Sequence, residues 1–334
     1  MKKTVLTGIK PTGRVHLGNY IGAIKPALDQ ATNKELEPVY FVADYHGLTK
    51  VRDQKQMQEL SYGIAATWLA LGLDPDHSIF YRQSDVPEIF ELSWILACFS
   101  PKGLMNRAHA YKSIVEKNRV ENREEDEGVN MGLFTYPILM ASDILLFQSN
   151  YVPVGKDQIQ HVEIARDVAL AFNRQFGETL TLPEHIVDEN TPVLPGLDGR
   201  KMSKSYHNTI PLFEEPAKLK KMINRITTDS SGPNEAKNPN HSTVFAFYKA
   251  FASEEQTIEM RKKFQEGIGW GEAKEELFLV MNDFFTKPRE TFHYYMSHTE
   301  ELDRILEAGA KKARAKAKPL LKEVKTKLGI QGQP

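Results

Sequence analysis

Short apolar runs alternate with stretches of helical period in the first half of the chain. Runs rich in β-branched and aromatic residues predict strands at residues 4–7, 39–43, 78–81 and 151–154. Apolar residues at helical spacing predict helices that begin near Leu17 and cover residues 53–73 and 159–176. Strand–helix–strand repetition at this spacing is typical of parallel βαβ units. We therefore expect an α/β fold with a Rossmann-like, doubly wound parallel sheet over residues 1–205.

The pattern changes after residue 205, where the strand signal fades. Helical spacing predicts helices at residues 214–225, 254–265, 273–285 and 300–328. Pro319 should kink or split the last of these helices. In the first half, a charged segment at residues 117–129 with four consecutive acidic residues is predicted to be a mobile solvated loop. The expected organisation is an α/β domain followed by an α-helical C-terminal domain.

Charge and composition narrow the class of protein. The chain of 334 residues has 43 basic and 44 acidic side chains, so any contact with a nucleic acid must come from local patches. The single cysteine, Cys98, excludes a disulfide framework and a cysteine-based metal cluster within one chain. The first apolar run is too short for a signal peptide, and no run approaches the length of a membrane span. We therefore expect a cytoplasmic globular protein.

A lysine-rich pentapeptide, Lys-Met-Ser-Lys-Ser at residues 201–205, follows a glycine-rich turn at residues 196–200. Its two ammonium groups can bind a polyphosphate, and its hydroxyls can act as additional donors. An arbitrary basic loop is more often simply solvated. Lys201 and Lys204 are thus candidate phosphate ligands, and Lys10 and Lys112 are further candidate cations.

A second glycine-rich element follows the first predicted strand. Its glycines, Gly8, Gly13 and Gly18, allow tight turns and a close approach of the backbone to a ligand, and the helix that follows presents its positive end to anions. His16 can donate to a phosphate oxygen, and Asn19 can contact ribose or phosphate. Ordinary βα packing is the common alternative, and the glycine spacing matches neither the dinucleotide fingerprint nor the P-loop. The basic pentapeptide downstream favours a nucleotide role.

Residues 132–146 are the most informative stretch for a second substrate. Tyr136, Met140 and Asp143 stand at positions i, i+4 and i+7 and therefore share one face of a helix. An aromatic ring, a thioether and a single carboxylate form an apolar slot with one acceptor, which suits an indole with one N–H. The alternative, in which Tyr136 and Met140 belong to the core and Asp143 is solvated or salt-bridged, is at least equally favoured by the spacing alone.

The motifs, taken together, resemble those of a known family. Pro-Thr-Gly-x-x-His-Leu-Gly-Asn at residues 11–19 and Lys-Met-Ser-Lys-Ser at 201–205 resemble the HIGH and KMSKS signatures of class I aminoacyl-tRNA synthetases. Residues 132–145 and 152–161, with Val-Pro-Val-Gly-x-Asp-Gln-x-x-His in the latter, resemble the bacterial tryptophanyl-tRNA synthetase family. The similarity covers the catalytic half and extends more weakly into the C-terminal helices.

The resemblance implies a reaction and its substrates. The family is a tryptophan–tRNA ligase: it activates L-tryptophan with ATP to tryptophanyl-adenylate, releases pyrophosphate and transfers tryptophan to tRNA(Trp). Such a step needs positioning and cations, not a side-chain nucleophile. We find no convincing metal-ligand cluster, so Mg²⁺ is expected to arrive with ATP. Some members of a second bacterial branch carry a four-cysteine iron–sulfur site, but residues 267–273 here hold no cysteine, so no iron–sulfur cluster is expected.

The resemblance also assigns roles to individual residues. The expected catalytic residues are His16, Asn19, Lys112, Lys201 and Lys204. The expected ATP-binding residues are Lys10, Pro11, Thr12, Gly18, Asn19, Gly155, Lys156, Asp157, Lys201, Met202, Ser203, Lys204 and Ser205. Asp143 would accept the indole N–H and Tyr136 and Gln158 would hold the α-ammonium group, while Gly8, Met140 and Val152 would line the pocket with His46 close by. Leu6, Lys10 and His16 depart from the better-known bacterial pattern.

The domain organisation and the partners follow from the same resemblance. Residues 1–205 would be the catalytic domain, residues 206–300 an anticodon-binding domain and residues 301–334 a basic C-terminal helix. A homodimer is implied by the family alone. The lysines of the last helix form either a solvated face or a set of tRNA phosphate contacts. A tyrosyl-tRNA synthetase and a non-charging, synthetase-like tRNA-binding regulator are the alternatives.

Overall fold

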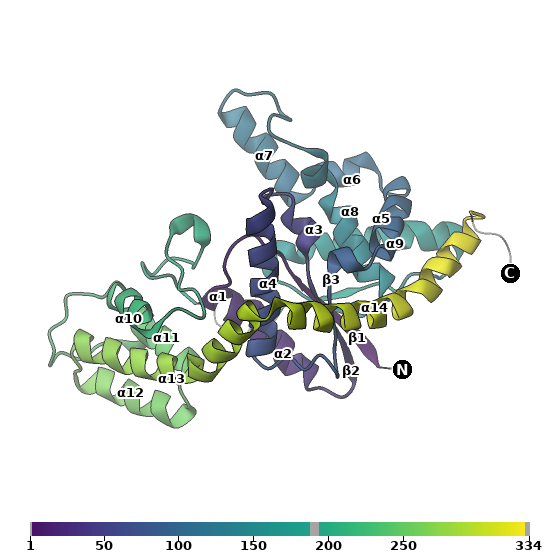
Figure 1. Cartoon of the computed structure of the whole chain (residues 1–334). Coiled ribbons are helices and arrows are strands. Elements are labelled where there is room, and N and C mark those ends of the chain that lie inside the picture. Colours follow the sequence, from purple (N-terminus) through teal and green to yellow (C-terminus); the bar gives the residue numbers. More distant parts are fainter. Residues whose placement is uncertain (1, 188–193, 331–334) are drawn as a thin grey trace.

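A five-stranded parallel sheet forms the centre of the catalytic half (Figure 1). The computed structural model describes residues 2–187 and 194–330, without the side chain of Asp157. The strands are β1 (Lys3–Ile9), β2 (Leu36–Val42), β3 (Ile79–Arg82), β4 (Tyr151–Pro153) and β5 (Glu184–Ile186), in the order β3-β2-β1-β4-β5. The predicted doubly wound sheet is confirmed. The order reverses between β1 and β4, and in such sheets the crevice at the carboxyl ends beside this point binds ligands.

Helices cover both faces of the sheet. Those of the first half are α1 (Leu17–Asn19), a π-helical turn (Tyr20–Ile24), α2 (Lys25–Ala31), α3 (Asp44–Gly47), α4 (Gln54–Ala70), α5 (Glu88–Cys98), α6 (Lys102–Asn106), α7 (His109–Val120), α8 (Met131–Leu146) and α9 (Ile159–Phe176). Short 3₁₀ turns lie at Gln83–Asp85, Lys156–Gln158, Lys204–Tyr206 and Pro239–His241. Successive residues of a strand face opposite sides. Accordingly, Tyr40 of β2 packs in one apolar cluster with Trp68 of α4, and Phe41 packs in the other with Phe147.

The acidic segment is more ordered than its composition predicts. Its first residues belong to α7, so the prediction of a loop from residue 117 is wrong for residues 117–120. Side chains of α7 hold the residues that follow the helix. Arg119 pairs with Glu125 at 2.7 Å, and the buried Asn118 donates to the carbonyl groups of Glu125 and Glu127. Tyr111 also donates to Asp126 at 2.6 Å. Like charges in this segment are therefore held by basic and amide side chains of the adjoining helix.

Five helices follow the basic pentapeptide: α10 (Pro216–Asn224), α11 (Thr243–Phe251), α12 (Glu254–Glu266), α13 (Trp270–Ser297) and α14 (Thr299–Lys327). The first four gather at one end of the molecule (Figure 1). Their interior is aromatic and includes Phe247, Phe264 and Phe285, all fully buried. Helix α14 runs through Pro319 without being split.

Helix α14 returns to the catalytic half and covers the edge strand β3 (Figure 1). Its early residues, among them Leu306, belong to one apolar cluster, and its later residues, among them Ala313 and Ala317, belong to the other. The approach is close because small residues recur along this face. A Cβ atom at Gly309 would collide with the backbone carbonyl of Phe80 in β3. The helix thus protects an edge that would otherwise offer unpaired backbone groups.

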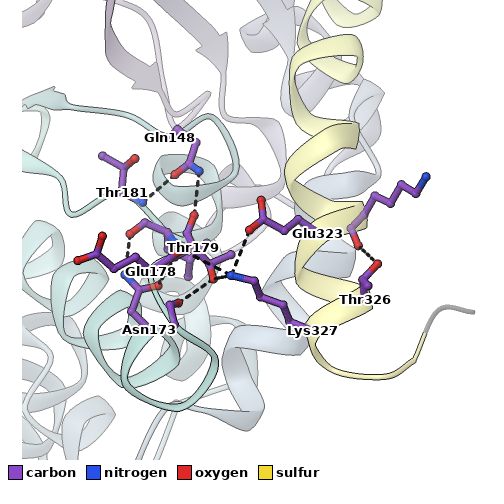
Figure 2. A network of polar contacts seen from close by, with 11 residues as sticks. Gln148, Asn173, Glu178, Thr179, Thr181, Glu323, Thr326 and Lys327 are labelled. Carbon is purple, nitrogen blue, oxygen red and sulfur yellow. Dashed lines mark hydrogen bonds and ion pairs between the residues drawn. The ribbon is translucent and has the colours of Figure 1, made fainter. Parts of the chain in front are cut away.

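Many basic side chains of α14 contact the catalytic half. Arg314 pairs with Glu88 at 3.0 Å, and Lys316 with Glu37 at 2.6 Å. Lys325 pairs with Glu91 at 2.6 Å, and Lys312 donates to the carbonyl groups of Pro75 and Asp76. Figure 2 shows the last turn, where Lys327 donates to the hydroxyl of Thr179 at 2.6 Å and pairs with Glu323. Lys312 stays exposed despite these contacts, and Lys311, Lys318 and Lys322 are exposed as well. The predicted segment 301–334 includes residues 331–334, which lie outside the described residues.

Gly309→Ala should lower the free energy of unfolding by about 1–3 kcal/mol, because overpacking against backbone forces α14 away from β3. Denaturant unfolding followed by circular dichroism measures this change. Gly63→Ala in α4 is the matched control, since no described atom beyond its own helix lies within 4 Å of the added methyl group. That control should stabilise the protein by up to about 1 kcal/mol through helix propensity. Equal effects of the two substitutions would contradict the close packing.

Candidate active site

The two glycine- and lysine-rich elements of the sequence lie against each other. Leu17 donates its backbone N–H to the carbonyl of Ile210 at 2.9 Å, and Leu212 donates to Val15 at 3.2 Å. The segment that follows the basic pentapeptide is thereby paired with the β1–α1 loop. Met202, buried within the pentapeptide, accepts the backbone N–H of Gly18 on its sulfur at 3.2 Å. The two motifs therefore lie next to each other.

Lys204 lies directly over Gly13. A Cβ atom at Gly13 would be 2.9 Å from the Lys204 ammonium nitrogen, and the glycine has a φ of +143°, so a side chain is excluded by space and by backbone conformation. Burial lowers the pKa of Lys204, and the nearby charge of Lys50 lowers it further. Within the described part of the chain, no carboxylate pairs with Lys204. An unpaired cation beside a glycine turn is suited to binding a phosphate.

His16 stands at the N-terminus of α1 and is almost fully buried. Burial, and then the charge of Lys204, lower the pKa of His16 to about 4. The imidazole is therefore neutral at pH 7. Its Nδ1 atom is buried without a hydrogen-bond partner among the described residues, and Asn19 accepts the backbone N–H of His16 at 3.2 Å. A neutral ring next to Lys204 can donate to a phosphate without adding to the charge.

Asp143 is the buried carboxylate of the site. It lies on α8 with 1% of its side chain exposed, and its Oδ2 atom is 2.8 Å from Nε2 of His46. Gln83 donates from Nε2 to Oδ1 at 2.8 Å and to Oδ2 at 3.1 Å. Burial raises the pKa of Asp143, while the hydrogen bonds from His46 and Gln83 oppose that rise. The carboxylate of Asp143 is thus buried, and two neighbouring side chains hold it.

Two strand ends bring the partners of Asp143 together. His46 lies on α3 directly after β2, and Gln83 begins the 3₁₀ turn after β3. The two turns are joined because Asp44 accepts the backbone N–H of Ser84 at 3.1 Å. Sequence reasoning missed Gln83, although a signal was present. Gln83 lies just beyond the predicted strand at residues 78–81, as the second glycine-rich element lies beyond the first predicted strand.

Among the other predicted pocket residues, Tyr136 contacts a side chain that holds this carboxylate. The ring of Tyr136 lies edge-on to His46 at 6.3 Å between centroids, and its hydroxyl is 2.5 Å from Nε2 of His161. Met140 and the buried Val152 pack in the same apolar cluster. Gly8 lies opposite Phe41 in the sheet, and a side chain at Gly8 would collide with the Phe41 ring.

The predicted ATP-binding segments reach the same edge of the sheet. The ammonium group of Lys10 is 5.7 Å from the ring centre of Tyr136, which joins the β1–α1 loop to the pocket. Pro11 packs against Gly47 of α3. Gly155 caps the 3₁₀ turn Lys156–Gln158 after β4, and the side chain of Asp157 lies outside the described part. Ser203 and Ser205 share a hydrogen bond of 2.8 Å between their hydroxyls.

Lys112 is not brought to the other candidates by any contact between described residues. It lies on α7, which projects from the sheet in Figure 1, and its side chain is 62% exposed and pairs with Glu116 at 3.7 Å. Lys201 is exposed as well, while its carbonyl accepts from Asn208. Residues 2–187 and 194–330 contain no group of three or more His, Cys, Asp or Glu that could hold a metal ion. None of the helices described is long and apolar enough to cross a membrane.

Comparison with known proteins places these features in a family. A model of the class I tRNA synthetases (W and Y) matches residues 2–286. The tryptophan–tRNA ligase of Neisseria meningitidis is 51% identical over 332 residues, covering 99% of this chain and 98% of that protein. That of Pseudomonas putida is 51% identical over 335 residues, covering 99% of this chain and 74% of that protein. The crystal structure of tryptophanyl-tRNA synthetase from Campylobacter jejuni complexed with ADP and tryptophan is 42% identical, with a TM-score of 0.89 and coverage of 98% and 99%.

Proposed function

The chain belongs to the class I tRNA synthetases for tryptophan and tyrosine and is a tryptophan–tRNA ligase, and on that premise we propose how its residues divide the reaction. One observation supports the division above all. A fully buried carboxylate, Asp143, lies at the carboxyl edge of the sheet, and the β1–α1 loop, over which Lys204 lies, reaches the same edge through Lys10. An aromatic amino acid can therefore meet ATP at this edge.

The lysines of the basic pentapeptide are proposed to bind the phosphates of ATP. The tryptophan carboxylate attacks the α-phosphorus of ATP, and the bond from that phosphorus to the bridging oxygen breaks, so that pyrophosphate leaves with the bonding electrons. Negative charge on the leaving group is met by Lys204 and Lys201, and the neutral His16 donates a hydrogen bond to a phosphate oxygen. The segments Lys10–Thr12, Gly18–Asn19, Gly155–Asp157 and Met202–Ser205 contact the nucleotide. Lys112 is a further candidate cation, which would reach the nucleotide only if α7 moved toward the site.

The tryptophan half of the proposal assigns one polar group to each end of the substrate. Asp143 accepts the indole N–H, and the hydroxyl of Tyr136 and the carboxamide of Gln158 hold the α-ammonium group. Gly8, Met140, Val152 and His46 line the pocket. The buried carboxylate of Asp143 disfavours binding of an amino acid without a ring N–H, such as phenylalanine. Such a ligand offers no donor, so the carboxylate lacks one hydrogen bond in the complex.

Magnesium and tRNA complete the set of ligands. Mg²⁺ enters with the phosphates of ATP, because proteins usually bind it through one or two carboxylates together with substrate phosphates. Residues 206–300 bind the anticodon of tRNA(Trp). Because Lys312, Arg314, Lys316, Lys325 and Lys327 contact the catalytic half, phosphate contacts from the basic helix 301–334 fall to the exposed Lys311, Lys318 and Lys322. The protein works in the cytoplasm.

A homodimer is the assembly that the exposed apolar side chains favour. Tyr45 packs on Phe90 of α5 with 4.3 Å between ring centres, and Trp94, one turn further along α5, is 74% exposed. Leu48 adds a further exposed apolar side chain at 49%. Contiguous exposed aromatics of this kind mark protein interfaces more often than free surface. This face is the one that a second copy would cover.

A crystal structure with tryptophan and a non-hydrolysable ATP analogue tests the site as a whole. We expect the indole nitrogen at about 2.9 Å from a carboxylate oxygen of Asp143, since this is the usual N–H···O distance. The phosphates should lie against Lys204 and His16. An indole that points away from Asp143, or phosphates bound elsewhere, would contradict the assignment.

A further inference from the structure

Gln83 donates hydrogen bonds to the carboxylate of Asp143, the group proposed to accept the indole N–H. Its side chain is fully buried, and its Nε2 atom lies 2.8 and 3.1 Å from the two oxygens of Asp143. His46 reaches only one of those oxygens, Oδ2. Gln83 is therefore the contact that bridges both oxygens, and it limits rotation of the carboxylate about its last bond.

The carboxamide of Gln83 is not simply satisfied by this arrangement. Its Oε1 atom is buried and has no hydrogen-bond partner among the described residues, and the same holds for the hydroxyl of the neighbouring Tyr81. A buried acceptor without a donor costs about 1–3 kcal/mol. Turning the carboxamide over would pair Oε1 with the Asp143 carboxylate, acceptor against acceptor. The observed orientation is thus set by Asp143, and the unpaired Oε1 is the cost.

The residues on either side of Gln83 are anchored, Ser84 through its backbone and Arg82 through its side chain. Ser84 donates its N–H to Asp44, the residue that begins α3. Arg82 donates to Asp85 at 3.1 Å and to Asp303 of α14 at 3.3 Å. A side chain that extends from such a turn keeps its position when the substrate enters, which is what a positioning residue requires.

We propose that Gln83 is a specificity-determining positioning residue, which holds the carboxylate of Asp143 with a lone pair directed at the indole N–H of tryptophan. This proposal rests on the proposed role of Asp143. Nothing in the arrangement makes Gln83 touch the reacting phosphate, so its contribution is to tryptophan recognition and not to the chemical step. The hydrogen bond from Gln83 also counteracts the rise that burial causes in the pKa of Asp143.

Gln83→Met keeps the length of the side chain and removes the donor. Hydrogen bonds to charged groups contribute enough that the KM for tryptophan in ATP–pyrophosphate exchange should rise about 10- to 100-fold, while kcat and the KM for ATP stay near wild type. The preference for tryptophan over phenylalanine should fall. The acid limb of kcat/KM for tryptophan should move to higher pH, because the carboxylate is more easily protonated without its donor.

Gln148→Met is the matched control. It removes another glutamine with two hydrogen bonds, to the carbonyl of Thr179 and from the backbone N–H of Thr181, at the far end of α14 (Figure 2). This variant should leave the KM for tryptophan and the pH profile unchanged. Thermal melts of both variants show whether they are folded at the assay temperature.

Gln83→Glu provides a second, independent variant. Two carboxylic groups at this distance share a proton, and the protonated one can donate to Asp143. Lowering the pH should therefore improve tryptophan binding in Gln83→Glu, whereas it weakens binding in the wild type. This inverted dependence is not expected from a glutamine that only fills space.

Asp143→Asn, measured in parallel, separates the two proposals. If Asp143→Asn loses tryptophan activity and Gln83→Met keeps wild-type KM, selectivity and acid limb, Gln83 is not a positioning residue and the role of Asp143 stands. If neither variant changes tryptophan kinetics, the role of Asp143 itself is wrong. A loss of kcat in Gln83→Met with unchanged KM and unchanged acid limb also overturns the proposal, because it shows a general structural defect.

Discussion

Lys204→Ala should slow the formation of tryptophanyl-adenylate by about 100- to 1,000-fold, the usual effect of removing one group that stabilises transition-state charge. Lys204 lies over Gly13 with no carboxylate partner among the described residues, so its charge is available to the departing pyrophosphate. That negative charge grows as the reaction proceeds. The substitution should therefore affect the rate more than the affinity for tryptophan.

Single-turnover kinetics at several tryptophan concentrations separate rate from affinity. Lys201→Ala should act in the same direction and more weakly, because it is the ammonium group of Lys204 that lies over the glycine turn at Gly13. Lys249→Ala is the control, since Lys249 is an exposed lysine on α11 in the helical half. A Lys204→Ala variant that mainly weakened tryptophan binding would show that the loop clamps the substrate and does not activate it.

Asp143→Asn should reduce kcat/KM for tryptophan by about 10- to 200-fold, which corresponds to the cost of about 1–3 kcal/mol for a mismatched buried polar group. The amide of asparagine retains one acceptor oxygen but places an NH₂ group where Asp143 has its second oxygen. This donor faces the nitrogen atoms of Gln83 and His46, which contact the carboxylate in the wild type. Selectivity against phenylalanine should fall as well, because an uncharged acceptor is less costly to leave unpaired. Exchange assays with tryptophan and phenylalanine measure both effects, and unchanged tryptophan kinetics would contradict the assignment.

The pH dependence of stability gives Asp143→Asn a second readout. Burial raises the pKa of Asp143 in the folded protein above its ordinary value of 3.8. A raised pKa means that the folded state binds the proton more tightly than the unfolded state. The stabilisation from that proton is fully present below pH 3.8 and is lost as the pH rises through the folded-state pKa. The substitution removes this slope, so the stability difference between variant and wild type should change across that window and be constant above it.

The sheet was predictable because its strands carry a local signal. The four predicted strands are observed, and residues 159–176 form a helix with the predicted bounds. Strand β5 was missed because it has only three residues and the first two are exposed, so no apolar run marks it. The shared face of Tyr136, Met140 and Asp143 was also predictable, since a helical period of 3.6 residues is enough to place them.

The position of α14 could not be predicted from its lysines. A basic run is usually a solvated face, but here its partners are acidic residues far away in the sequence. Arg314 and Glu88 are 226 positions apart, and Lys316 and Glu37 are 279 positions apart. The small residues at Gly309, Ala313 and Ala317 carried the relevant signal, because they allow a helix to approach a strand closely.

The candidate site, too, was predictable in part from the sequence. Motif resemblance predicted which residues matter, and the structure adds contacts that motifs do not encode, such as Lys204 over Gly13 and Met202 against the backbone of Gly18. Lys112 has no such contact with the described loops, so its role stays a prediction. Gln83 contacts both carboxylate oxygens of Asp143 and belongs to no quoted motif.

ATP–pyrophosphate exchange with each of the twenty amino acids in turn is the most direct test of the central claim, that this site selects tryptophan for adenylation. Exchange needs no tRNA, so it reports the catalytic half alone. We expect strong exchange with tryptophan and much slower exchange with tyrosine or phenylalanine. Exchange that is equal with tyrosine, or absent with every amino acid, would contradict it.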